Sequence, residues 1–106
     1  MCAAQEEHRG QLRGHAHDYM SFAETCAIAM RKEGVLGVLC VDSQGLCLHS
    51  EGEVPDGCSG AVAEMALRSL TLAGDDAVVT VEAAERKVVI SRSDSVTIAL
   101  FMSPKA

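Results

Sequence analysis

The chain has 106 residues, a length that suits one small domain with a single hydrophobic core. Its formal net charge is −6 at pH 7 and its longest basic clusters are only two residues long, so nucleic acid is not an expected partner. Tyr19, Phe22 and Phe101 are its only aromatic residues, which argues against an aromatic-lined ligand pocket.

Targeting signals are not apparent. The N-terminal residues lack the apolar core of a signal peptide, and no apolar run approaches the length of a membrane span. The five cysteines are odd in number and loosely spaced, which favours buried free thiols in a reducing compartment. We therefore expect a cytoplasmic protein, and if it works on a membrane, something else has to hold it there.

The first expected element is a helix at about residues 18–32. Residues 1–15 before it show no hydrophobic periodicity, so we expect a disordered tail followed by one domain at residues 16–106. The helix is predicted because apolar residues recur at a spacing of three and four. These residues are Tyr19, Phe22, Ala23, Cys26, Ala27 and Met30.

Two strands are expected next, at residues 35–41 and 46–49. Asp42-Ser43-Gln44-Gly45 predicts the turn between them, because Asp and Ser bond to the backbone and Gly accepts a positive φ. A second helix is expected at about residues 57–72, with Asp56 as its N-cap. Its apolar stripe comprises Val62, Met65, Ala66, Ser69 and Leu70, and Ala61 and Leu72 widen it, which indicates that the helix buries more than one side.

Three strands close the predicted domain, at residues 77–82, 87–91 and 96–102. The order is thus α-β-β-α-β-β-β, which indicates an α+β fold with one five-stranded antiparallel sheet. A third helix after the last strand is not expected, because only four residues remain there and Pro104 interrupts them.

The expected strands are apolar on both faces, as Val88, Val89 and Ile90 illustrate. Five strands span about 24 Å, whereas one packed helix covers about 10 Å of that width. Two helices therefore leave part of the sheet uncovered, and a bare apolar area of several hundred Å² is more than a typical monomer exposes. The sequence thus predicts a surface for a partner protein.

The sequence resembles the roadblock/LC7 family over about residues 34–103. The segments that carry the resemblance are residues 37–40, residues 42–46, Asp56, Gly60, residues 65–66 and residues 93–99. Within the family it is most similar to the small subunits of Ragulator, a scaffold at lysosomes, which also lack a third helix. The loop at residues 74–76 is shorter than is usual in the family. The resemblance implies αβα layers, with helices on both faces of the sheet.

The resemblance also implies a heterodimer with another roadblock-domain subunit, formed through the second helix and the third strand. In such a complex a lipidated membrane-anchor subunit wraps the assembly, which recruits Rag GTPases so that amino acids activate the mTORC1 kinase. Carried over to this sequence, the implied interface residues are Val62, Met65, Ala66, Ser69, Val78, Val79, Thr80 and Val81. The alternative is that Val62 and Met65 belong to the internal core, because core and interface look alike in one sequence.

Two other functions stay open. One is a homodimeric roadblock GTPase regulator or a dynein-type cargo adaptor. The other is a small cysteine-based enzyme or redox sensor that uses Cys58, at the expected start of a helix, or the Cys40 and Cys47 pair. Cys47 and His49 are expected on one strand face near Cys40, but a fourth ligand is not evident, so we expect neither a metal nor a cofactor. No catalytic residue is assigned.

Overall fold

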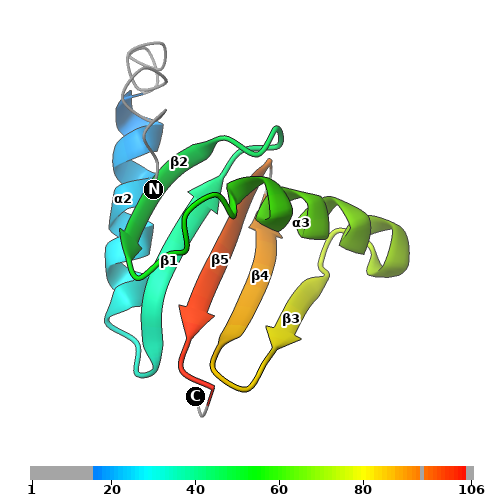
Figure 1. Cartoon of the computed structure of the whole chain (residues 1–106). Helices are drawn as coiled ribbons and strands as arrows, with labels where there is room; N and C mark the ends of the chain where they lie inside the picture. Colours follow the sequence, from blue (N-terminus) through cyan, green and yellow to red (C-terminus); the bar gives the residue numbers. More distant parts are fainter. Residues whose placement is uncertain (1–15, 94, 105–106) are drawn as a thin grey trace.

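The structure, a computed structural model, describes residues 16–93 and 95–104, so the predicted disordered tail at residues 1–15 lies outside the described residues. The described elements follow the predicted order of helix, two strands, helix and three strands. They are α2 (Ala16–Met30), β1 (Val35–Val41), β2 (Cys47–Gly52), α3 (Ser59–Ala73), β3 (Val78–Glu82), β4 (Lys87–Ser93) and β5 (Val96–Met102) (Figure 1).

All five strands form one sheet with the order β2-β1-β5-β4-β3, and every neighbouring pair is antiparallel. β1 is buried at each residue except Leu36, which explains why its sequence is apolar on both faces. β2 and β3 are the two edge strands. The predicted five-stranded antiparallel sheet is therefore confirmed.

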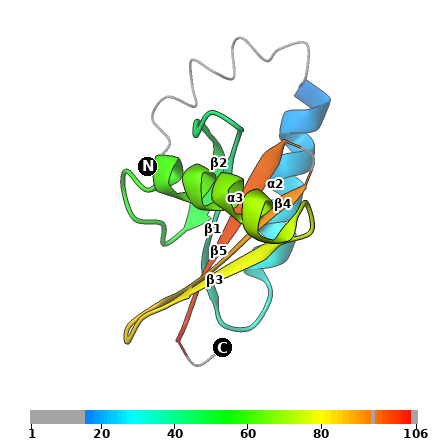
Figure 2. The ribbon, with the colours of Figure 1, turned by 90° about the vertical axis from the view of Figure 1, so that its right-hand side faces the viewer.

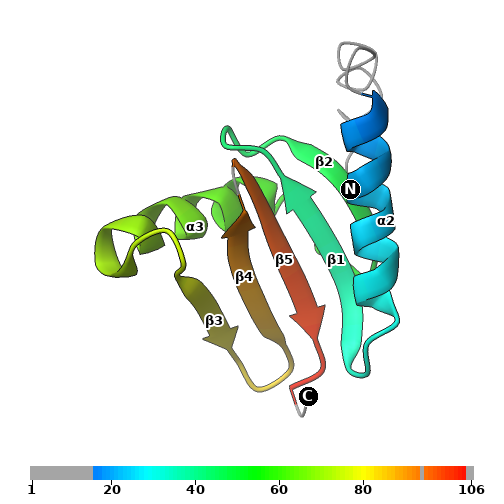
Figure 3. The same ribbon diagram turned by 180° about the vertical axis from the view of Figure 1, so that it is seen from behind.

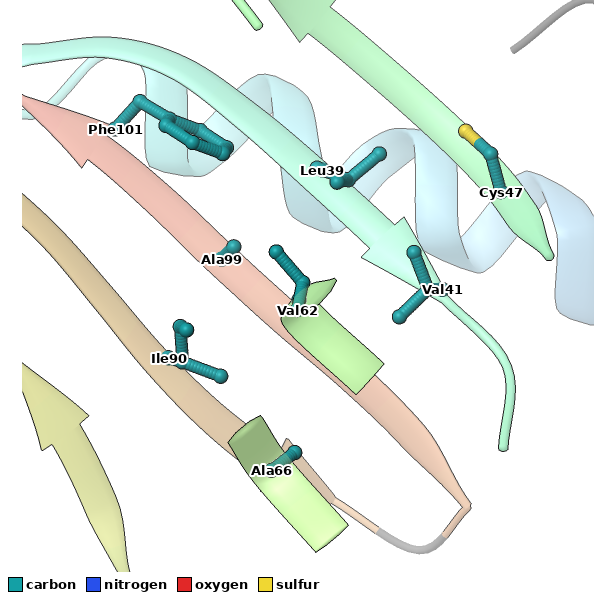
Figure 4. Close-up of a cluster of buried hydrophobic side chains, with 8 residues drawn as sticks. All are labelled: Leu39, Val41, Cys47, Val62, Ala66, Ile90, Ala99 and Phe101. Atoms are coloured by element: carbon teal, nitrogen blue, oxygen red, sulfur yellow. The ribbon is translucent and has the colours of Figure 1, made fainter. Parts of the chain in front are cut away.

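The two helices lie on opposite faces of the sheet, so the molecule has three layers (Figure 2). α3 crosses one face and α2 packs mainly on β1 and β2 of the other (Figure 3). The core under α3 is drawn in Figure 4 and comprises Leu39, Val41, Cys47, Val62, Ala66, Ile90, Ala99 and Phe101. The core under α2 comprises Cys26, Val35, Val38, Cys40 and Leu48.

The turn between β1 and β2 has the predicted chemistry. One carboxylate oxygen of Asp42, Oδ1, accepts hydrogen bonds from the backbone N–H groups of Gln44 and Leu46, both at 2.9 Å. Gly45 adopts a φ of 87°, which is the left-handed conformation expected of a glycine at this position. These contacts fix where β1 ends and β2 begins.

Several predicted boundaries differ from the structure. α3 begins at Ser59 with Cys58 as its N-cap, not Asp56, and Cys58 makes no capping hydrogen bond through its side chain. Gly57 has a φ of 75°, so the chain turns the opposite way before a right-handed helix can start. α2 ends at Met30 and not at residue 32, whereas β2 and β4 run two or more residues further than predicted.

A β-bulge in the first hairpin overturns the expectation that Cys47 and His49 share a face. Cys40 pairs with His49 but Val41 pairs with Cys47, so the register shifts between these pairs. Cys47 belongs to the core under α3, whereas His49 lies on the α2 face with Cys40. His49 Nε2 contacts the Glu51 carboxylate at 3.0 Å.

Candidate partner interface

β3 leaves one edge of the sheet open. In the described part of the chain it pairs with β4 alone, and its side chains are the least buried of any strand. Val78 is 59% exposed and Val81 is 42% exposed. Because Val and Thr favour strands and the edge carries unpaired backbone groups, β3 is suited to pairing with a strand of another protein.

α3 lies beside this edge and presents apolar side chains in two directions. Val62, Ala66 and Ser69 are buried against the sheet, and the Ser69 hydroxyl donates to the Ala66 carbonyl oxygen at 2.6 Å. This bond satisfies the hydroxyl within the helix, so a polar side chain is accommodated in the core. Met65 is 39% exposed and Leu72 is 86% exposed, so the side that the sequence predicted to be buried is on the surface of this chain.

An apolar groove of about 180 Å³ runs between α3 and the β3 side of the sheet. We call it the α3–β3 groove. Its lining is Cys58, Ala61, Val62, Met65, Val81, Val88, Ile90 and Phe101. No residue in this lining is charged, so a partner side chain that enters the groove has to be apolar to avoid burying an unpaired polar group.

The predicted interface residues therefore divide into two groups. Val62, Ala66 and Ser69 are buried in the chain's own core, whereas Met65, Val78, Thr80 and Val81 are exposed and Val79 is half-buried. Their role in binding stays a prediction. The sequence reasoning did not assign Ala61 and Val88 to the interface, although both line the groove; their apolar character was the available signal.

A second uncovered surface lies on the α2 side of the sheet. Within the described residues, α2 covers β1 and β2 and leaves the same face of β5, β4 and β3 open (Figure 3). Half-buried apolar side chains line the β5 part of this open half-sheet: Val96, Ile98, Leu100 and Met102. Each helix thus covers only a part of its face, as the width of the sheet requires.

Among the described cysteines, neither Cys58 nor the Cys40 and Cys47 pair has the arrangement considered from the sequence for an enzyme or a metal site. Burial raises the pKa of the Cys58 thiol, which disfavours the thiolate form that a nucleophilic cysteine needs. Cys40 and Cys47 lie on opposite faces of the sheet, and Cys47 is disulfide-bonded, so it is not the free thiol expected. Among the described residues, no three His, Cys, Asp or Glu side chains form a group that could hold a metal.

A contact that the sequence reasoning missed joins Cys26 of α2 and Cys40 of β1. Their Sγ atoms lie 3.2 Å apart, and both thiols are free and buried. Cys26 was predicted on the buried stripe of its helix and Cys40 in a buried strand, so the burial of each cysteine was predicted. Their contact with each other was not predicted, because it depends on how α2 lies across the sheet.

A five-stranded antiparallel sheet between two helices, with these connections, is the fold of roadblock/LC7 domains. The structure is similar to that of a roadblock/LC7 domain from Streptomyces avermitilis, with a TM-score of 0.61, 17% identity and 72% of each chain covered. It is also similar to the gliding protein MglB from Thermus thermophilus, with a TM-score of 0.71, 16% identity, and 83% of this chain and 75% of that chain covered. These likenesses show the fold.

The family within this fold follows from the sequence. The family model of the Ragulator complex protein LAMTOR5 matches residues 21–102, so the chain belongs to the LAMTOR5 family. It is 29% identical over 84 residues to the Ragulator complex protein LAMTOR5 homolog of Dictyostelium discoideum, covering 77% of this chain and 94% of that protein. The resemblance to the roadblock family and its small Ragulator subunits is thereby confirmed. Neither described helix has the length and apolarity needed to cross a bilayer.

Proposed function

We propose that the chain is a non-catalytic scaffold subunit of a Ragulator-like complex that heterodimerises with another roadblock-domain subunit. The observation that carries this proposal is the position of the apolar α3–β3 groove directly beside the open edge of β3. A partner strand added to β3 supplies backbone hydrogen bonds, and apolar side chains of the partner fill the groove.

The energetic case rests on desolvation of apolar surface that this chain leaves exposed. Val78 and Val81 on β3 and Met65 on α3 are partly exposed although each is apolar. Removing apolar area from water contributes about 25 cal/mol per Å², so covering several such side chains offsets part of the entropic cost of association. Membership of the LAMTOR5 family supports the same conclusion.

The complex has further partners in this proposal. The open half-sheet beside β5 is available to the lipidated anchor subunit, which holds the assembly at the lysosomal or late endosomal surface. The assembled scaffold then helps to recruit Rag GTPases for the amino-acid activation of mTORC1. Membership of the LAMTOR5 family supports these roles.

The proposal is tested by co-expressing the full chain with a second roadblock-domain subunit and measuring the mass of the purified species. We expect a soluble 1:1 heterodimer by size exclusion and native mass spectrometry. Met65→Glu and Val81→Lys place charge in the groove and should abolish the heterodimer, because an unpaired buried charge is costly. Ile28→Glu is the matched control, since Ile28 is apolar and 56% exposed but lies on α2, and it should leave the heterodimer intact.

Other results decide against the proposal. A stably monomeric chain that ignores every roadblock partner would contradict it. A homodimer that persists when the second subunit is present would favour the homodimeric regulator instead. Equal loss of binding in Ile28→Glu and Val81→Lys would show that the groove is not the contact.

A further inference from the structure

The core between α2 and the sheet contains two thiols in direct contact. Cys26 Sγ and Cys40 Sγ lie 3.2 Å apart, and both residues are 0% exposed. The residues are 14 positions apart in sequence and come from a helix and a strand, so the contact depends on tertiary packing. At this distance one thiol donates a hydrogen bond to the other.

The hydrogen bond makes the two sulfurs chemically unequal. It raises the pKa of the Cys26 thiol, and burial raises it further. The same bond lowers the pKa of Cys40, although burial and the Glu51 carboxylate act in the opposite direction. Cys40 is therefore the sulfur that loses its proton first, and Cys26 keeps the proton that stabilises the resulting thiolate.

We propose that Cys26 and Cys40 form an oxidisable dithiol that hydrogen peroxide converts into a disulfide joining α2 to β1. This modification site is independent of partner binding, because both sulfurs lie under α2 and away from the α3–β3 groove. The two sulfurs already face each other and have to close from 3.2 Å to about 2.05 Å to bond.

The reaction has two balanced steps. The Cys40 thiolate attacks one peroxide oxygen, the O–O bond breaks, and Cys40 becomes a sulfenic acid while hydroxide leaves and takes up the proton that Cys40 lost. The Cys26 sulfur then attacks the Cys40 sulfur, the S–O bond breaks, and the oxygen leaves as water with the Cys26 proton. Two electrons pass from the sulfurs to the peroxide, so two thiols and one peroxide become one disulfide and two waters.

The surroundings of the pair favour a small oxidant. Apolar side chains of the core under α2 pack beside the two sulfurs, including Val38 of β1 and Leu48 of β2. A bulky disulfide reagent cannot enter such a core without displacing the helix, whereas peroxide is about the size of a small solvent molecule. The new bond would keep α2 attached to β1 in the native state and in states in which α2 is otherwise partly detached from the sheet.

The test compares reduced, full-length protein before and after treatment with hydrogen peroxide. The protein is then unfolded, alkylated and digested with trypsin, which releases residues 14–31 with Cys26 as their only cysteine. We expect the alkylatable fraction of Cys26 to fall close to zero and a linked peptide pair to appear, in which fragmentation joins Cys26 to Cys40. Hydrogen exchange in α2 should slow by about a hundredfold, the effect that the chain-entropy account gives for a closed loop of about 15 residues.

Matched variants separate this pairing from general oxidation. In Cys40→Ala the Cys26 thiol should stay alkylatable after peroxide. In Cys58→Ala the alkylatable fraction of Cys26 should fall close to zero, as in the unmodified chain. The proposal is overturned if Cys26 stays alkylatable after peroxide, if the alkylatable Cys26 is lost equally in Cys40→Ala, or if the linked partner of Cys26 is any cysteine other than Cys40. If Cys40→Ala does not fold, the cysteine identified by fragmenting the linked pair from the unmodified chain decides the question.

Discussion

At Gly37, β1 passes close to the chain that follows β2. A Cβ atom at this position would come closer than 3.0 Å to three backbone atoms of Glu53. The Glu53 N–H also donates to the Leu36 carbonyl at 2.9 Å, so the two segments cannot separate without losing a hydrogen bond. Glycine is therefore needed here for close approach of two backbones, not for its φ angle.

Gly37→Ala is accordingly expected to lower the free energy of unfolding by about 1–3 kcal/mol, the usual cost of forcing an extra carbon into a packed site. Urea denaturation of the full chain measures this change. Gly60→Ala is the control, because a Cβ at Gly60 of α3 meets nothing within 4 Å. Alanine has a higher helix propensity than glycine, so the free energy of unfolding of the control should be unchanged or slightly higher. Equal unfolding midpoints for the two variants would contradict this account.

Cys58 provides a pH-dependent prediction at the same scale. Because burial raises its pKa above the ordinary value of 9.0, a smaller fraction is thiolate at neutral pH than in a free cysteine. Alkylation of Cys58 in the folded chain should therefore be slower than in the urea-unfolded chain at pH 8, and its rate should keep rising above pH 9. Mass spectrometry of the alkylated peptide, measured over time, gives both rates. A folded chain that reacts as fast as the unfolded one would show an unburied thiol.

At the scale of elements, α3 separates residues that hold the fold from residues available to a partner. Both Val62 and Met65 line the α3–β3 groove, but Val62 is buried against the sheet, whereas Met65, one turn along, is partly exposed. Val62→Ala should lower the free energy of unfolding of the isolated chain by about 1–3 kcal/mol, because it leaves a cavity. Met65→Ala should change that free energy little, yet weaken the heterodimer roughly tenfold.

Denaturation of the single chain and titration with the partner measure the two effects separately. If Met65→Ala destabilised the isolated chain as much as Val62→Ala, Met65 would belong to the internal core. That outcome would remove α3 from the proposed interface while leaving β3 to be tested.

Element boundaries were predictable from the sequence where neighbouring residues alone determine them. Asp42 and Gly45 specify the first turn through short-range hydrogen bonds and a positive φ, so sequence alone located it. Asp56 has the chemistry of an N-cap, but Gly57 adopts a left-handed conformation and the helix begins only at Ser59. The sequence does not predict this φ, because glycine is compatible with both positive and negative values. The bulge between Cys47 and His49 depends on pairing with β1, which is a non-local contact. The division of α3 into buried and exposed sides likewise required the assembled sheet.

At the scale of the whole molecule, the sheet has two edge strands with different capacities for pairing. β2 carries His49, Glu51 and Gly52 towards its end, whereas β3 reads Val-Val-Thr-Val-Glu. Charged residues and glycine disfavour the addition of a strand, and β-branched residues favour it. The apolar groove adjoins β3 and not β2. Both features favour strand addition on the β3 side of the molecule.

Hydrogen exchange on the full chain, with and without a saturating roadblock partner, distinguishes the two edges. We expect the backbone amides of β3 to exchange at about one tenth of their free rate, or slower still, in the complex. Strand addition gives unpaired N–H groups new acceptors, and the partner shields them from water. Amides of β2 serve as the internal control and should be unchanged, since that edge lies at the opposite end of the sheet. Protection of β2 with β3 unaffected would place the partner on the wrong edge. Protection confined to α3 would mean that helix packing alone, without a continuous sheet, joins the two subunits.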